Sequence, residues 1–189
     1  DGALEEGVFW ESLNFAALRG LRILFVCEDN GLAIHTPAHE RQGFRSIPEA
    51  IQGFHCHAAS GDGTDLLGVL AMAEEIVAKM KQEPKPGFLH LTYYRFLEHV
   101  GPREDFDAGY RRRPTPEEIE RLDPVIKFEK VLRQQGGMDE ELARVQTSVD
   151  EQLSRSVAAA KQAPFAPPAE LYTDLWAETS PSPPALQPT

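Results

Sequence analysis

Three residues near the start of the chain have the types and the spacing of a metal–diphosphate site. Asp1 precedes Gly2, and residues 3–29 separate Gly2 from Asn30. An aspartate carboxylate and an asparagine carbonyl are hard oxygen ligands, which Mg²⁺ prefers in an octahedral shell that also takes phosphate oxygens and water. A glycine beside the aspartate lets the backbone approach a diphosphate closely. The stretch therefore predicts one half of an Mg²⁺–diphosphate site.

The chain contains a control for this spacing. A complete Gly-Asp-Gly occurs at residues 61–63, but the step that leads from Asp1 to Asn30 leads from Asp62 to Leu91, whose side chain has no ligand atom. Gly, Asp and Thr in close succession are typical of a turn. We therefore interpret residues 60–64 as a turn and assign the metal to the first stretch alone.

The elements that must position these residues alternate between helix and strand. Apolar residues recur at helical spacing before Gly20, and the run that follows is apolar throughout, which is typical of a strand buried on both faces of a parallel sheet. A βαβ unit follows, whose strands should be parallel. The pattern predicts an α/β fold with a parallel sheet flanked by helices. In chain order we expect a helix over residues 3–19, strands over 22–27 and 54–58, a helix over 65–81 and a strand over 88–94.

The rest of the chain reads as a functional loop, a helical extension and a tail. Residues 95–113 follow a strand and should lie at the carboxyl edge of the sheet, where α/β proteins bind ligands. Capping signals at Ser46, Thr115 and Asp123 predict three helix starts. We expect domains over 1–113, 114–163 and 164–189. Within the Pro-rich tail the last ten residues should be disordered, and the side chains that could dock are Leu171, Tyr172, Leu175 and Trp176.

Composition excludes two classes of partner. The formal net charge is -11, which disfavours nucleic acids and anionic membranes, because both attract clustered Lys and Arg. The sequence has no apolar run of membrane-spanning length. Cys27 and Cys56 lie in apolar segments and are expected to be buried, reduced thiols of a cytoplasmic protein.

The wider sequence resembles a known family. Asp1-Gly2 and Asn30 match the end of the thiamin-diphosphate signature, which is Gly-Asp-Gly followed at this distance by Asn. The stretches ALEEGVFWESLNFAAL, FVCEDN and AIHTP are similar to the α subunit of the E1 component of 2-oxo acid dehydrogenases, a family that includes the pyruvate, branched-chain and acetoin enzymes. The resemblance covers residues 1–130 and implies the C-terminal portion of a thiamin-diphosphate-binding fold.

The family resemblance also implies cofactors, partners and roles. The cofactors are thiamin diphosphate and Mg²⁺, and the partners are an E1 β subunit in an α₂β₂ assembly, a lipoyl-bearing E2 and a 2-oxo acid substrate. The implied metal ligands are Asp1, Asn30 and the carbonyl of Leu32. His99 follows a Tyr-Arg pair and is the candidate catalytic residue, close to the reacting centre. The implied cofactor-binding residues are Asp1, Gly2, Ala3, Asn30, Leu32, Arg95 and His99.

The chain departs from the family pattern at several points. Asp29 stands where the family usually has Asn, and Val100 stands where a phosphorylatable Ser is common, so that kinase control is not expected. The first Gly of the signature is not in the chain. The free α-amine of Asp1 is mostly protonated at neutral pH, and a cation beside a metal ligand should weaken the site. We therefore expect the isolated chain to bind thiamin diphosphate poorly and to be inactive.

Other interpretations stay open at this point. A transketolase-like ketol transferase shares the signature, and an inactive fragment serving as an interaction module would explain the incomplete site. The tract His55-Cys56-His57 would alternate its side chains in a strand and so does not favour a metal site. Residues Arg111–Arg113 lie beside acidic residues and are expected to be paired locally.

Overall fold

The computed structural model describes residues 1–173, apart from the side chain of Tyr172. The chain divides into two units, Asp1–Met138 and Asp139–Thr189. The second unit contains the long helix α6 (Asp139–Gln162) and the 3₁₀ helix η4 (Pro168–Tyr172). Leu171 is 69% exposed; Leu175, Trp176 and the last ten residues lie outside the described range. Within that range no helix is long and apolar enough to cross a lipid bilayer.

The first unit is built on a parallel sheet of three strands. The strands are β1 (Leu24–Asp29), β4 (His57–Asp62) and β5 (Gly87–Thr92), in the order β1-β5-β4. Both neighbours pair with β5 in parallel and in step, so that Asp29 and Asp62 both lie opposite Thr92. This confirms the predicted α/β fold, and it brings the carboxyl ends of all three strands to one edge.

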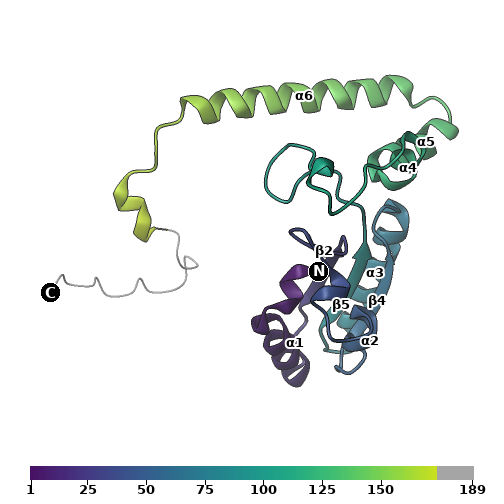
Figure 1. Cartoon of the computed structure of the whole chain (residues 1–189), viewed down its shortest axis with the longest axis vertical. Helices are drawn as coiled ribbons and strands as arrows, with labels where there is room; N and C mark the ends of the chain where they lie inside the picture. Colours follow the sequence, from purple (N-terminus) through teal and green to yellow (C-terminus); the bar gives the residue numbers. More distant parts are fainter. Residues whose placement is uncertain (174–189) are drawn as a thin grey trace. The chain divides into compact units, whose positions relative to one another are not determined.

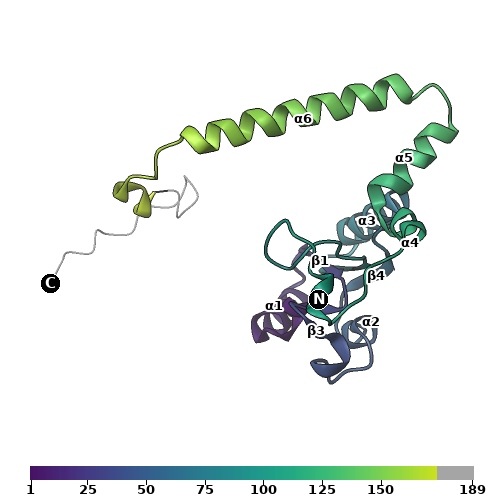
Figure 2. The same ribbon diagram turned by 45° about the horizontal axis from the view of Figure 1, so that its top comes forward.

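Helices cover both faces of the sheet (Figure 1 and Figure 2). On one face, α1 (Gly7–Arg19) and α2 (Ile47–Ile51) pack against Phe88 and Cys27. On the other face, α3 (Leu66–Gln82) packs through Ile76 and Met80 against β5 and β4. Residues 87–91 of β5 are all buried, because this central strand has a strand on each side and helices above and below.

The first predicted helix is divided in two. Residues Gly2–Glu5 form the 3₁₀ helix η1, Glu6 is extended, and α1 begins at Gly7. The predicted end is confirmed, since Gly20 caps α1 in the left-handed conformation. Val8 is one of the apolar residues whose helical spacing predicted a buried face, and it is instead 62% exposed.

The predicted first strand was placed too early. Residues 22–23 are not part of it, and β1 continues to Asp29, because pairing with β5 rather than apolarity sets its ends. Its expected burial on both faces is also wrong: β1 lies at the sheet edge, and Val26 is 53% exposed. The third strand begins at Gly87 and ends at Thr92 instead of at residue 94.

The second predicted strand, like the first, lies further towards the C-terminus in the structure than the sequence predicted. It runs over His57–Asp62 and not over residues 54–58, so Gly61 and Asp62 of the second Gly-Asp-Gly belong to a strand and only the residues after them turn. Gly61 lies against α3: a side chain there would meet the end of Met72 at 2.5 Å. The glycine therefore permits close packing of α3 on β4.

The remaining elements surround the carboxyl edge of the sheet. The predicted caps are confirmed: Ser46 accepts from Glu49 N, Thr115 and Glu118 form a full capping box, and Asp123 caps the next helix. The elements that surround the carboxyl edge are β2 (Leu32–Ala33), β3 (Thr36–Pro37), η2 (Ala38–Glu40), η3 (Phe106–Ala108), α4 (Pro116–Leu122) and α5 (Pro124–Gln134).

Candidate functional site

A cavity of about 490 Å³ lies at the carboxyl edge of the sheet. It is bounded by the first turn of the chain, the segment after β1 and the segment after β5. All seven residues that the sequence analysis assigned to the cofactor line this one cavity, although they come from segments far apart in the chain. The lining residues are Asp1, Gly2, Ala3, Glu28, Asn30, Leu32, Ala33, Ile34, Tyr93, Arg95 and His99.

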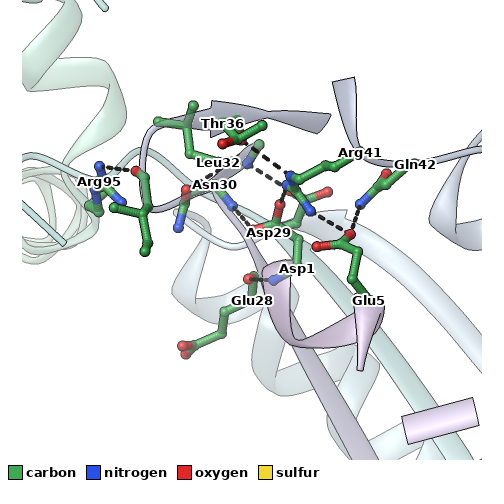
Figure 3. A network of polar contacts seen from close by, with 12 residues as sticks. Asp1, Glu5, Glu28, Asp29, Asn30, Leu32, Thr36, Arg41, Gln42 and Arg95 are labelled. Carbon is green, nitrogen blue, oxygen red and sulfur yellow. Dashed lines mark hydrogen bonds and ion pairs between the residues drawn. The ribbon is translucent and has the colours of Figure 1, made fainter. Parts of the chain in front are cut away.

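Asp1 is held from three sides (Figure 3). One carboxylate oxygen accepts from the guanidinium of Arg41, and the other lies 3.4 Å from the backbone N of Asn30. Its α-ammonium donates to the Glu28 carbonyl at 2.9 Å. The Asp1 side chain is 1% exposed and that of Arg41 is 9% exposed. The carboxylate thus already has a cation beside it, which the sequence analysis did not foresee.

The segment after β1 turns back through two side-chain hydrogen bonds. Asp29 Oδ1 accepts from Gly31 N at 2.8 Å, and Asn30 Oδ1 accepts from Leu32 N at 3.1 Å. The Asn30 amide donates to the hydroxyl of Tyr93 at 3.1 Å. We call residues 30–32 the binding turn, because they carry two of the three predicted oxygen ligands.

A short hairpin continues from the binding turn and presents a strained residue to the cavity. Leu32 pairs with Pro37 and Ala33 with Thr36, which leaves Ile34 and His35 as a two-residue loop. Ile34 has φ of 55°, a left-handed conformation that is rare for a β-branched residue. Its carbonyl accepts from Arg95 at 3.0 Å, and its side chain is 54% exposed at the cavity.

Arg95 combines a structural role with unused donors. Its Nη2 donates to Tyr110 at 2.7 Å, and Asp105 lies 3.7 Å away. Its Nε and Nη1 are buried and have no hydrogen-bond partner among the described residues. Because buried polar groups are almost always paired, these two donors are available to a ligand that carries acceptor atoms. His99 lines the same cavity and is exposed.

The loop that contains these residues is cross-linked by ion pairs. Arg111 pairs with Asp105 at 2.5 Å, Arg113 with Glu104 at 2.5 Å, and Arg112 with Glu118 at 2.5 Å. This confirms the local pairing predicted for Arg111–Arg113. Arg112 holds the pKa of Glu118 down to about 2, with the Thr115 backbone adding to the effect.

The second Asp-Gly has a different use. Asp62 accepts from the hydroxyl and the backbone N of Thr64, and it pairs with Lys127 of α5 at 3.1 Å. The hydrogen bond from the Thr64 side chain is the main reason why the pKa of Asp62 is lowered. Asp62 does not line the 490 Å³ cavity; it anchors α5 to the end of β4.

The histidine–cysteine tract lies mostly outside β4. His55 and Cys56 precede the strand, so the alternation expected for all three residues does not apply. No cluster of three or more His, Cys, Asp or Glu able to hold a metal occurs among the described residues. Cys27 and Cys56 are free thiols. Cys27 is buried and Cys56 is partly buried, and burial raises the pKa of both.

A second cavity, of about 610 Å³, lies between α1 and the open edge of β1. It is lined mainly by apolar side chains, among them Val8, Phe9, Phe25 and Val26. Three residues line both cavities: Asp1, Ala3 and Glu28.

Comparison with known proteins identifies the family of the chain. Residues 1–169 match the family model described as dehydrogenase E1 component. The chain is 33% identical to pyruvate dehydrogenase E1 component subunit alpha of Porphyra purpurea, over 94% of this chain and 51% of the relative. It is 27% identical to 2-oxoisovalerate dehydrogenase subunit alpha of Bacillus subtilis, over 94% of this chain and 54% of the relative. The chain spans about half the length of the curated relatives it matches.

Proposed function

Because the chain belongs to the dehydrogenase E1 component family, we propose that it is the part of an E1 α subunit that binds the Mg²⁺–diphosphate end of thiamin diphosphate. The reaction would be oxidative decarboxylation of a 2-oxo acid. The observation that carries the proposal is the convergence of Asp1, Asn30, Leu32 and Arg95 on one cavity. The family relatives named above act on different substrates, so the 2-oxo acid itself stays open.

The residues present fit both parts of the ligand. Asp1, Asn30 and the Leu32 carbonyl are a hard oxygen set, which suits Mg²⁺ and leaves positions for phosphate oxygens and water. The unpartnered Nε and Nη1 of Arg95 supply charged donors of the kind that bind phosphate oxygens. Arg41 occupies Oδ2 of Asp1, so a metal ion at that oxygen would displace the guanidinium, and a metal ion at Oδ1 would lie close to it.

Each group has a defined task in this proposal. Thiamin diphosphate, when bound, supplies the electron sink for loss of CO₂. The binding turn and Asp1 hold the metal, Arg95 and His99 donate to the diphosphate, and Ile34 forms an apolar wall. Residues that bind the rest of the cofactor would come from an E1 β subunit in an α₂β₂ assembly. The acyl product would pass to a lipoyl group on E2, and the complex would be cytoplasmic.

The experiment is performed on the complete α chain co-expressed with its β subunit. Wild-type complex should release CO₂ from one member of a panel of 2-oxo acids when thiamin diphosphate and Mg²⁺ are present. Asn30→Ala should weaken cofactor binding measured by calorimetry, while Asn14→Ala, at an exposed position on α1, should not. Ketol transfer without decarboxylation, or equal binding by the two variants, would overturn the proposal.

A further inference from the structure

A chain of hydrogen bonds crosses all three strands just below the carboxyl edge of the sheet. Ser60 Oγ lies 2.7 Å from His90 Nδ1, and His90 Nε2 lies 2.8 Å from Asp29 Oδ2. On β4, Ser60 pairs directly with His90 of β5. On β1, the residue that pairs with His90 is Cys27, and Asp29 lies two residues beyond it. The strand alternation therefore places the three side chains on one face.

Two members of this chain of hydrogen bonds, His90 and Asp29, are largely enclosed, and Ser60 is exposed. The His90 side chain is 8% exposed and that of Asp29 is 19% exposed. His90 lies on the same face of the sheet as Phe88 and Cys27, which belong to the core beneath α1 and α2. A buried imidazole needs partners for its nitrogens, and here both are used. When Nε2 donates to the carboxylate, a neutral ring accepts the Ser60 hydroxyl at Nδ1, so the ring orientation is fixed from two sides.

The second oxygen of Asp29 connects this chain to the binding turn. Asp29 Oδ1 accepts from Gly31 N at 2.8 Å, and Gly31 has φ of 76°. The carboxylate is therefore held between His90 on one side and the turn on the other. Asp29 stands where the family usually has Asn, and a partly buried carboxylate at that position requires a partner, which His90 provides.

We propose that His90 is a positioning residue, which acts through Asp29 to hold the binding turn in its metal-binding shape. The inference rests on the proposed function, because it assigns His90 to the support of that site. Partners behind a metal-binding group typically change metal affinity by about ten- to a hundredfold when removed. The same residue types occur in nucleophilic triads, but Ser60 lines neither of the two cavities described above.

The test compares His90→Leu, which cannot donate to Asp29, with His90→Gln, whose amide can. It uses the complete α chain with its β subunit. The first measurement is amide hydrogen exchange at Gly31 and Leu32 without cofactor, with amides of α3 as the internal reference. His90→Leu should accelerate exchange in the turn about tenfold, and His90→Gln should largely restore it. Asp29→Ala removes both the link to His90 and the hydrogen bond from Gly31 N, so it should accelerate exchange in the turn at least as much as His90→Leu and gives the upper limit for the effect. Acceleration in Asp29→Ala with no acceleration in folded His90→Leu would refute the role of His90.

The second measurement is the Kd for thiamin diphosphate with Mg²⁺. It should rise about tenfold in His90→Leu and stay near the wild-type value in His90→Gln. A lowered melting temperature with unchanged turn exchange and unchanged Kd would show a purely structural role and refute the inference. If the wild-type complex hydrolyses p-nitrophenyl acetate and Ser60→Ala abolishes this hydrolysis, Ser60 acts as a nucleophile. That result would refute the positioning role of His90. If the wild-type complex binds no cofactor, the proposed function fails, and hydrogen exchange alone decides the role of His90.

Discussion

Arg41 competes with a metal ion for the Asp1 carboxylate, and replacing it should tighten metal binding. Its guanidinium pairs with Asp1 and, through Nη1, with Glu5 at 2.6 Å, while its Nε donates to the Thr36 carbonyl at 3.2 Å. In Figure 3 it lies directly beside the Asp1 carboxylate. A metal ion at Asp1 Oδ2 would replace the guanidinium, and a metal ion at Oδ1 would be repelled by it, since both cations would share one carboxylate. Removing the guanidinium by Arg41→Ala removes this competition.

The size of the effect follows from the burial of the pair. A hydrogen bond between charged groups contributes about 1.5–3 kcal/mol, and each 1.4 kcal/mol or so corresponds to about tenfold in affinity. Mg²⁺ should therefore bind Arg41→Ala about ten- to a hundredfold more tightly than wild type. Without metal the variant should be less stable, by up to about 3–5 kcal/mol, because Asp1, whose side chain is 1% exposed, loses its partner.

Two titrations of the complete chain with its β subunit check this reasoning. Calorimetry with Mg²⁺ and saturating thiamin diphosphate gives the affinity, and thermal unfolding at rising Mg²⁺ concentrations should show a larger stabilisation of the variant than of wild type. Arg45→Ala, at an exposed position nearby, is the matched control and should change neither quantity. Equal or weaker Mg²⁺ binding by Arg41→Ala would mean that Arg41 supports the site and does not compete for it.

Two further perturbations test local features. Ile34→Gly should leave the free energy of unfolding within about 1 kcal/mol of wild type, because relief of the left-handed strain offsets the flexibility of glycine. Ile23→Gly, at a 43% exposed position, should be clearly destabilising in the same urea experiment; a similar loss for both variants would argue against strain. For Glu118 the pKa is depressed from 4.5 to about 2, so its stabilisation is present above pH 4.5 and is lost as the pH falls towards about 2. An NMR titration should give that midpoint, and Arg112→Ala should raise it; an unchanged midpoint would exclude Arg112 as the cause.

Local signals in the sequence predicted the helix ends well. The caps at Ser46, Thr115 and Asp123 depend on side chains within three residues of the backbone that they bind, so no tertiary information is needed. The ends of β1 and β4 were misplaced because pairing with β5 sets them. At the carboxyl edge, polar side chains continue the strands beyond their apolar runs, which hides these ends from a hydropathy pattern.

The candidate site was foreseen where spacing carried information and missed where only the fold brings residues together. Arg41 reaches Asp1 through the return of the chain after β3, and nothing in the local sequence indicates that contact. The conformation of Ile34 follows from closing a two-residue hairpin loop. The sequence does carry a signal for His90: a carboxylate at the end of β1, at Asp29, requires a hydrogen-bond donor, and a neighbouring strand can supply one.

Helix α6 determines how the folding of this protein should be measured. It has 24 residues and none of them is buried, so its contribution to the far-ultraviolet circular dichroism reports on the helix–coil equilibrium of α6 itself. Trp10 instead packs against Phe44 and Phe54 in the core beside α1, and its indole donates to the Leu4 carbonyl at 2.7 Å. The fluorescence of Trp10 therefore reports on the core, whereas circular dichroism also includes α6, and we expect the two probes to give different unfolding midpoints.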